Sequence, residues 1–272
     1  LAGYPGSRHG VWCALIAGKN DEMQRDEWYE TGRDAAELPE AGSVGRRAGE
    51  RAMQRLGARK IATTQVPVLF EAPVAASLLG NFVSAVSGGN LYRKSSFLLD
   101  SAGKPVFSSL VNMSEQPHIA KGLASTPFDE EGVATRSRDV VKGGVVQGYF
   151  LGSYSARKLG LRSTGNAGGN HNLVLQDTGT DFAGLLKTMS TGLLVTELLG
   201  HGVNPVTGDY SRGAAGYWVE GGEIAYPVQE ITIAGNLKDM FRGIVAVGND
   251  VIRHGSRQCG SILVERMTVA GD

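Results

Sequence analysis

Glu71 is the side chain that first suggests chemistry in this sequence. It stands in VPVLFEAPVAASLLG, between the apolar run 66–70 and a helix-like segment that begins near Pro73. A glutamate at such a join can activate metal-bound water when flanking histidines hold the metal ion. Here the flanking positions carry Phe70 and Ala75, whose side chains have no lone pair to give a metal. The stretch therefore indicates either a metal site that has lost its ligands or a piece of apolar core.

Histidine and cysteine offer few other candidate ligands. No two of the five histidines have the three- or four-residue spacing that places two ligands on one helix face. His171, in the loop GGNHN, and Cys259, next to Gly260, are candidates to line a site, and Cys259 could be a nucleophile or a ligand. The alternatives are an ordinary polar loop residue for His171 and a structural thiol for Cys259.

Two glycine-rich stretches resemble functional loops only in composition. GNAGGN at 165–170 lacks both the GxGxxG pattern and the GK[ST] of a phosphate loop, so a turn is the better interpretation. GDYSRGAAG at 208–216 contains Ser211, but not in the GxSxG pattern of a nucleophile elbow. This second stretch predicts a tight turn into a strand.

The composition excludes several classes of protein. The chain has 272 residues, with 27 Lys plus Arg against 27 Asp plus Glu, so its formal charge is zero and gives no general attraction to nucleic acid or anionic membranes. It has no run of about 18 apolar residues and no visible signal peptide. Two cysteines make no disulfide framework, which fits a reduced, cytoplasmic setting. Because the first residue is Leu1, we expect a fragment or a processed product.

The segment 43–60 predicts a helix with one apolar and one basic face. Ser43 is a natural N-cap and Gly57 a natural stop. The apolar face repeats every four residues, at Val44, Ala48, Ala52 and Leu56. The basic face carries Arg46, Arg47, Arg51, Arg55, Arg59 and Lys60. We interpret it as a solvated helix face, since a nucleic-acid patch would also need interleaved aromatic residues and a basic chain.

The remaining pattern is mostly strands with a few helices. We expect a buried strand at 10–17, a polar, turn-rich connection at 19–42, hairpins at 95–109 and 216–235, a strand then a loop from 140, strands at 172–177, 192–200 and 261–269, and a helix after Asn236. This order predicts an α+β fold with a mainly antiparallel or mixed sheet. We expect residues 1–42 to be the end of an N-terminal domain with its connector, and 43–272 to be one C-terminal domain.

The C-terminal half carries long, specific motifs. They are LGSYSARKLGLRSTGNAGG, TELLGHGVNPVTGDYSRGAAGYWVEGGEIAYPVQEITIAGNLKDMF and VGNDVIRHGSRQCGSILVERMTVAG. These motifs resemble the TldD/PmbA family, on its PmbA/TldE branch, and the similarity is dense from about residue 64 to the end. The resemblance implies a TldD/PmbA-type fold.

The same resemblance gives Glu71 a family context. The TldD branch carries HExxxH at this strand-to-helix join, and its histidines, with a Cys near the C-terminus, hold a catalytic metal. On that pattern Phe70 replaces the first His, Glu71 matches the Glu, and Ala75 replaces the second His. Cys259 lies near the family's C-terminal Cys, although RHGSRQCG does not align with it residue by residue. We therefore expect no metal in this subunit.

The resemblance implies a subunit of a cytoplasmic TldD–TldE metalloprotease that acts on unfolded or small peptides. In the family this activity is linked with microcin maturation and antitoxin degradation. The expected partners are a TldD-type subunit that carries zinc, an extended peptide substrate and, as a further option, a second copy of this chain. One alternative is an independent metallopeptidase with a metal at Glu71, His171 or Cys259. Another is a binding module for gyrase or DNA that uses the basic face at 46–60.

Overall fold

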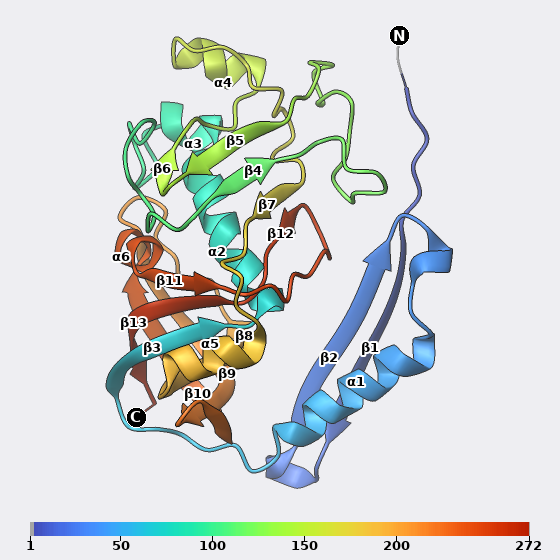
Figure 1. Ribbon diagram of the computed structural model, residues 1–272, viewed down its shortest axis with the longest axis vertical. Coiled ribbons are helices and arrows are strands. Elements are labelled where there is room, and N and C mark those ends of the chain that lie inside the picture. Colours follow the sequence, from blue (N-terminus) through green and yellow to red (C-terminus); the bar gives the residue numbers. More distant parts are fainter. Residues whose placement is uncertain (1–2, 272) are drawn as a thin grey trace.

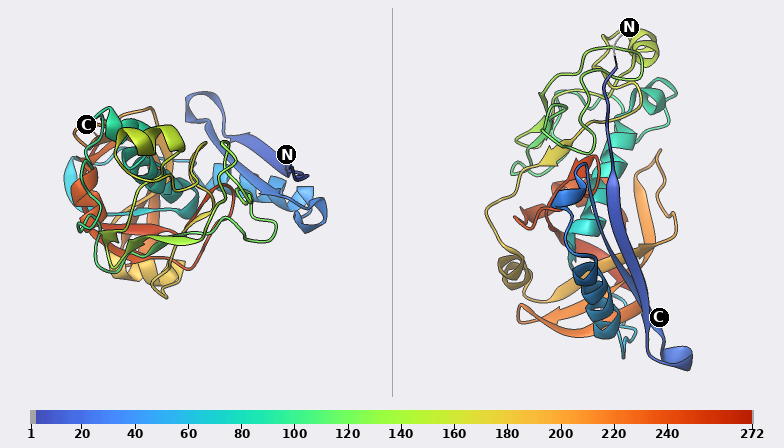
Figure 2. Two further views of the ribbon diagram at one scale, coloured as in Figure 1. Left: turned by 90° about the horizontal axis from the view of Figure 1, so that it is seen from above. Right: turned by 90° about the vertical axis from the view of Figure 1, so that its right-hand side faces the viewer.

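The N-terminal part of the chain is a β-hairpin covered by one helix. The computed structural model describes residues 3–271. Strands β1 (His9–Ala17) and β2 (Gln24–Gly32) pair antiparallel, and helix α1 (Ala41–Gln54) packs across one face of the pair (Figure 1). Two short 3-10 turns, η1 (Asn20–Glu22) and η2 (Ala35–Glu37), complete it. We call residues 3–56 the N-terminal unit. It stands at one side of the larger remainder of the chain (Figure 2).

The larger part is built on a six-stranded sheet. The strand order is β10-β9-β8-β3-β13-β11, and a further β10–β13 pairing joins five of these strands into a closed ring. All neighbours are antiparallel except β3 and β8. The strands are β3 (Thr64–Phe70), β8 (Gly192–Leu199), β9 (Asp209–Glu220), β10 (Glu223–Asn236), β11 (Ile244–Val247) and β13 (Ile262–Ala270).

A second, five-stranded sheet lies beyond helix α2 (Figure 1). Its order is β12-β7-β4-β5-β6, with bounds β4 (Met113–Glu115), β5 (Arg138–Lys142), β6 (Val145–Val146), β7 (Leu173–Leu175) and β12 (Arg257–Gln258). The helices are α2 (Ala72–Ala85), α3 (Gly88–Tyr92), α4 (Ser153–Lys158), α5 (Phe182–Met189) and α6 (Leu237–Arg242). The main hydrophobic core, around Phe70, Phe82 and Phe241, joins α2 to both sheets.

The predicted α+β class is confirmed, and several elements follow their local signals. The strand-to-helix join at Glu71 is present, with Pro73 in the first turn of α2 where a missing N–H costs nothing. The β9–β10 hairpin turns at Gly221 and Gly222, both with positive φ. Asn236 caps α6, because its side chain accepts a hydrogen bond from the Lys238 N–H.

Other predictions were wrong for physical reasons. The strand at 10–17 exists but is not buried, because α1 covers only one face of a two-stranded sheet; Trp12 is 61% exposed. The connection at 19–42 contains β2, whose polar side chains gave no sign of a strand in the sequence. Ser43 does not cap α1, which begins at Ala41. Residues 95–109 form turns rather than a hairpin, and α4 and α5 were not predicted.

Within residues 3–271, no helix is long and apolar enough to cross a membrane. Helix α1 packs mainly on β1 and β2, and its buried Val44 and Ala48 share a small core with Trp28. The division that we expected, between residues 42 and 43, thus falls inside this helix, in its first turn. The connection from α1 to β3 runs over residues 55–63.

Candidate functional site

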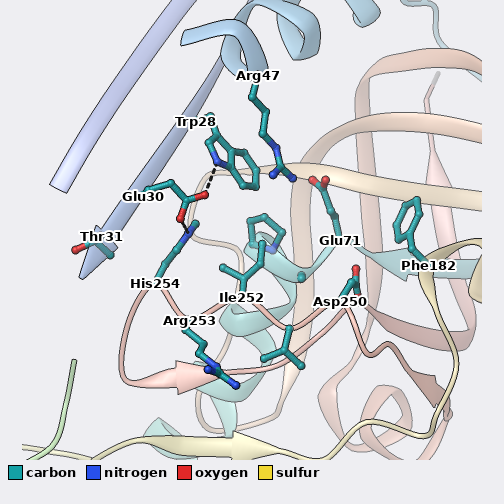
Figure 3. A pocket seen from close by; sticks show the side chains of 13 residues that line it. Trp28, Glu30, Thr31, Arg47, Glu71, Phe182, Asp250, Ile252, Arg253 and His254 are labelled. Atoms are coloured by element: carbon teal, nitrogen blue, oxygen red, sulfur yellow. Dashed lines mark hydrogen bonds and ion pairs between the residues drawn. The ribbon is translucent and has the colours of Figure 1, made fainter. Parts of the chain in front are cut away.

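Glu71 lies at the junction between the N-terminal unit and the larger part of the chain. It is the N-cap residue of α2, and its N–H donates to the Val195 carbonyl at 3.0 Å. A cavity of about 670 Å³ opens beside it (Figure 3). β2, α1, the first turn of α2, Phe182 and the loop 250–254 line this cavity. We call it the junction cavity.

The Glu71 carboxylate is held by an arginine from the other side of the junction. Arg51 donates Nη1 to Oε1 at 2.9 Å and Nη2 to Oε2 at 3.1 Å, a bidentate pair. Its Nε donates to Asp26 Oδ1 at 3.1 Å. Burial alone would lower the pKa of Arg51, but the hydrogen bonds and charges of Glu71 and Asp26 raise that pKa above its ordinary value. Both oxygens of Glu71 are therefore engaged by a permanent cation.

The two positions that flank Glu71 belong to the core. Phe70 and Ala75 are fully buried in the main hydrophobic cluster, where their side chains pack against hydrocarbon. Across residues 3–271, no three His, Cys, Asp or Glu side chains are grouped so that they could hold a metal ion. Because the Glu71 carboxylate is paired to Arg51 and its two flanking positions are hydrocarbon, this donor set does not fit a zinc ion.

Cys259 is a buried, protonated thiol. Burial, and next the negative charge of Asp250, raise its pKa to about 12. Because the thiolate is the form that attacks substrates and binds metals, this environment disfavours both roles for Cys259. It pairs with Ile252 across a β-bridge, so it supports the loop that lines the junction cavity.

We expect Cys259 to resist thiol reagents until the protein unfolds. At pH 8 a pKa of about 12 leaves roughly one thiol in 10⁴ ionised, against about a quarter for an ordinary thiol. In a Cys13→Ser variant, an aromatic disulfide reagent should release no colour from the folded chain and one equivalent in denaturant. Prompt labelling of the folded variant at pH 8 would contradict this burial.

The cavity wall also contains charged and aromatic side chains that sequence reasoning did not select. The Arg47 guanidinium lies 3.5 Å from the ring centre of Trp28, a cation–π contact. Glu30 accepts hydrogen bonds from Trp28 Nε1 at 2.8 Å and contacts His254 Nε2 at 3.0 Å (Figure 3). The sequence signal for one of them was visible: Arg47, Arg51 and Arg55 recur every four residues on one helix face.

Comparison with known proteins gives this arrangement its context. The model of the PmbA/TldA metallopeptidase C-terminal domain matches residues 63–271, and that of the central domain matches residues 1–56. The chain belongs to the PmbA/TldD family. The two matched regions meet between residues 56 and 63, so α1 falls with the hairpin.

Curated relatives and solved structures agree. Metalloprotease PmbA of Escherichia coli O157:H7 is 53% identical over all of this chain, and a PmbA homologue of Haemophilus influenzae is 47% identical. The chain spans 60% of the length of each. The crystal structure of a protein named as a modulator of DNA gyrase, from Bacteroides thetaiotaomicron, superposes with a TM-score of 0.92 at 29% identity, over 97% of this chain and 60% of that one.

TldE from Thermococcus kodakarensis superposes with a TM-score of 0.84 at 22% identity, over 96% of this chain and 62% of that one. This likeness concerns the fold alone. Within the family fold, the junction cavity lies where the central-domain and C-terminal-domain regions meet.

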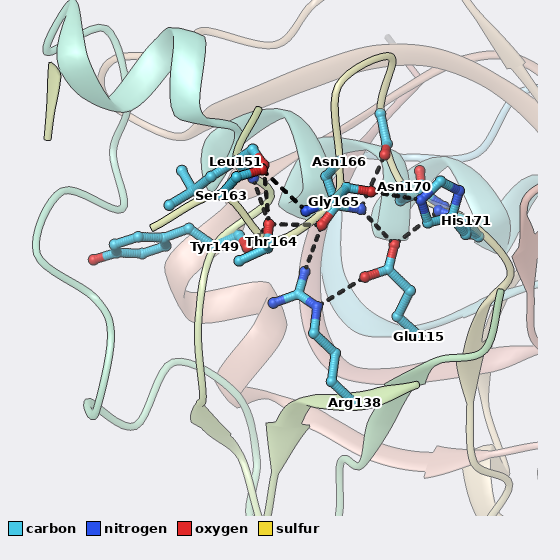
Figure 4. Close-up of polar contacts among 11 residues, drawn as sticks. Glu115, Arg138, Tyr149, Leu151, Ser163, Thr164, Gly165, Asn166, Asn170 and His171 are labelled. Atoms are coloured by element: carbon cyan, nitrogen blue, oxygen red, sulfur yellow. Dashed lines mark hydrogen bonds and ion pairs between the residues drawn. The ribbon is translucent and has the colours of Figure 1, made fainter. Parts of the chain in front are cut away.

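His171 lies in a different part of the structure from Glu71. Its ring Nε2 lies 2.8 Å from the Gly165 carbonyl oxygen, and its backbone N–H donates to the buried carboxylate of Glu115 (Figure 4). It lines a separate cavity with Tyr4 and the glycine loop at 167–169, a cavity that does not include Glu71 or Cys259. The structure therefore does not bring the three candidate ligands together.

The basic face predicted at 46–60 is solvated only in part: Arg46, Arg47, Arg59 and Lys60 are exposed, whereas Arg51 is half-buried and Arg55 is buried. Two of its members face carboxylates of the N-terminal unit or of the larger part: Arg51 pairs with Asp26 and Glu71, and Arg55 contacts Glu197 at 2.6 Å. Further along, Arg59 stacks on Tyr226 and Lys60 pairs with Glu230. Because Arg51, Arg55 and Lys60 are paired with carboxylates and Arg59 stacks on Tyr226, the face does not present the continuous free positive stripe that a nucleic-acid interface needs.

Proposed function

We propose that this chain is the non-catalytic subunit of a cytoplasmic two-subunit metalloprotease, with a TldD-type subunit as its zinc-bearing partner. The observation that carries the proposal is the bidentate Arg51–Glu71 pair between two fully buried hydrocarbon side chains, Phe70 and Ala75. The substrates would be unfolded or small peptides, microcin precursors and an antitoxin among them.

The chemistry of the family reaction supports this assignment. A metallopeptidase needs ligands that fix a metal, and a carboxylate that can take a proton from the metal-bound water. Here the matching carboxylate is neutralised by Arg51, and no imidazole flanks it. The proposed role of the chain is therefore structural: it supports the active partner and holds part of an extended peptide.

The junction cavity suits that second role. Its volume of about 670 Å³ falls in the range of sites for small ligands, and its wall combines apolar Trp28, Phe182 and Ile252 with charged groups. An extended peptide of two or three residues fits such a space. A second copy of this chain is the other candidate partner, in the absence of a TldD-type subunit.

The deciding experiment measures cleavage of an unfolded peptide by the full-length protein alone and mixed with the TldD-type subunit of the same organism. With zinc present, we expect activity only in the mixture, abolished by a chelator. Purified alone, the protein should carry well below one zinc per chain by atomic emission. Chelator-sensitive cleavage by this protein alone would overturn the proposal and favour an independent metallopeptidase.

A further inference from the structure

The junction cavity contains three carboxylates, and the protein itself satisfies all of them. Glu71 is held by Arg51, and Glu30 by Trp28 and His254. Asp250 accepts hydrogen bonds from the Ser261 N–H at 2.8 Å and from Ser261 Oγ at 2.7 Å. No acidic group in the cavity is thus left over for a cation.

Two guanidinium groups that line the same cavity, those of Arg47 and Arg253, have no such partners in the described part of the chain. Among residues 3–271, neither Arg47 nor Arg253 has a carboxylate within 4 Å or a hydrogen-bond acceptor. Arg47 enters from α1 and is fixed flat on Trp28, whereas Arg253 projects from the loop on the other side of the cavity (Figure 3). Arg253 is exposed, so its donors are free to meet a ligand.

The position of Arg253 connects two hollows. It and Val251 line both the junction cavity and a second cavity of about 540 Å³ that runs along β4 and β7. The wall of this second cavity mixes uncharged polar side chains such as Ser114, Gln116 and Gln176 with apolar side chains and with the charged Asp139, Lys142 and Asp177. A chain that passes from one hollow to the other must pass Arg253.

The local field adds to the effect of these two arginines. The 14-residue helix α2 directs its N-terminus, at Ala72 and Pro73, toward the cavity, and the positive end of a helix dipole favours negative charge. Its first N–H is already used, since Ala72 donates to Ser261 Oγ. The helix therefore contributes potential, and the free donors are those of the arginines.

We propose that the junction cavity binds a carboxylate of an extended peptide, with Arg253 as the group that contacts it and Arg47 as a second positive charge. The proposal rests on the proposed function, in which this subunit holds part of a peptide. A guanidinium matches a carboxylate with two parallel hydrogen bonds, which a lysine ammonium cannot reproduce. Trp28 and Ile252 provide apolar surface for the side chain next to that carboxylate.

The test measures binding of labelled peptides to the full-length protein alone, by fluorescence anisotropy. Three unstructured decapeptides share one uncharged sequence: one has a free C-terminal carboxylate, one a C-terminal amide, and one an amide with a single Glu. We expect the free acid to bind about tenfold tighter than the plain amide. If the Glu-containing amide binds as tightly, the source of the carboxylate is a side chain; if it binds like the plain amide, the source is the chain end.

The variants separate a specific contact from general attraction. Arg253→Gln should remove the tenfold preference, and Arg253→Lys should keep only part of it. Arg242→Gln, at an exposed position on α6 away from the cavity, is the matched control and should keep the preference. Equal binding of all three peptides, or a preference that survives Arg253→Gln, would overturn the inference.

This binding assay and the cleavage assay fail independently. The anisotropy measurement needs neither the partner nor zinc. An active mixture without carboxylate preference would remove the inference alone. An inactive mixture with the preference intact would remove the proposed function alone.

Discussion

Arg51→Met is expected to lower the free energy of unfolding by about 3 kcal/mol, because it leaves the largely buried carboxylates of Glu71 and Asp26 without this cationic partner. The Arg51 side chain is 16% exposed, and its partners Glu71 and Asp26 are 18% and 11% exposed. Methionine preserves the aliphatic stem but supplies no donor. Urea unfolding of the full chain, followed by tryptophan fluorescence, measures the change, since Trp28 lies beside the Arg51 guanidinium.

A double-mutant cycle isolates the Arg51–Glu71 pair. Adding Glu71→Gln to Arg51→Met removes the unpaired negative charge of Glu71 and should recover part of the lost stability. Asp26 still has Arg55 as a cationic partner, at 3.6 Å. Arg46→Met, on the solvent side of the same helix, is the matched control; its contact with Glu40 is long and exposed, and we expect a change below about 0.5 kcal/mol. If Arg51→Met were as mild as Arg46→Met, the pair would not hold the junction.

The parts of the fold that could be predicted are those with a local cause. The Gly221–Gly222 turn, the Asn236 cap and the apolar run before Glu71 each act within a few residues, so the sequence alone indicated them. Glycine also has a local steric role where two strands approach closely. A Cβ on Gly216 would lie 1.9 Å from the Leu194 carbonyl oxygen, where β9 and β8 approach closely.

The elements that escaped prediction depend on distant contacts. The sequence of β2 is mostly polar and does not by itself indicate a strand. Its buried side is covered by α1, which comes later in the chain. For the same reason Arg51 and Arg55, on the basic face, were interpreted as solvated. Nothing near Arg55 in the sequence shows that Glu197, at the end of a strand more than a hundred residues later, lies against it.

The candidate site divides in the same way. The replacement of two ligand positions, at Phe70 and Ala75, is visible in the sequence because residue type alone decides it. The neutralisation of Glu71 was not visible, because Arg51 comes from a different unit and is placed by the packing of α1 on the hairpin. The sequence therefore indicates what the site lacks, and the fold shows what took its place.

Glu115→Ala is expected to destabilise the protein by about 3 kcal/mol or more, through the buried network in Figure 4. Glu115 is 1% exposed. One of its oxygens accepts from Asn166 Nδ2 at 2.6 Å and from the His171 N–H at 2.8 Å, and the other accepts from Arg138 Nε at 2.8 Å. Alanine removes the acceptor that these three donors share and leaves the Arg138 guanidinium without its carboxylate partner. Thermal and urea unfolding of the full chain measure the effect.

Two further variants show that the network, rather than general packing, carries this effect. Glu115→Gln keeps the shape and one acceptor oxygen, so it should cost less than Glu115→Ala, about 1–2 kcal/mol. Asp139→Ala removes a carboxylate from the exposed side of β5, where its contact with Lys142 is 3.6 Å long; we expect a change within about 0.5 kcal/mol. Because Glu115 fixes both ends of the 166–171 loop to β4, a Glu115→Ala protein that kept its stability would mean that this loop is held by something else.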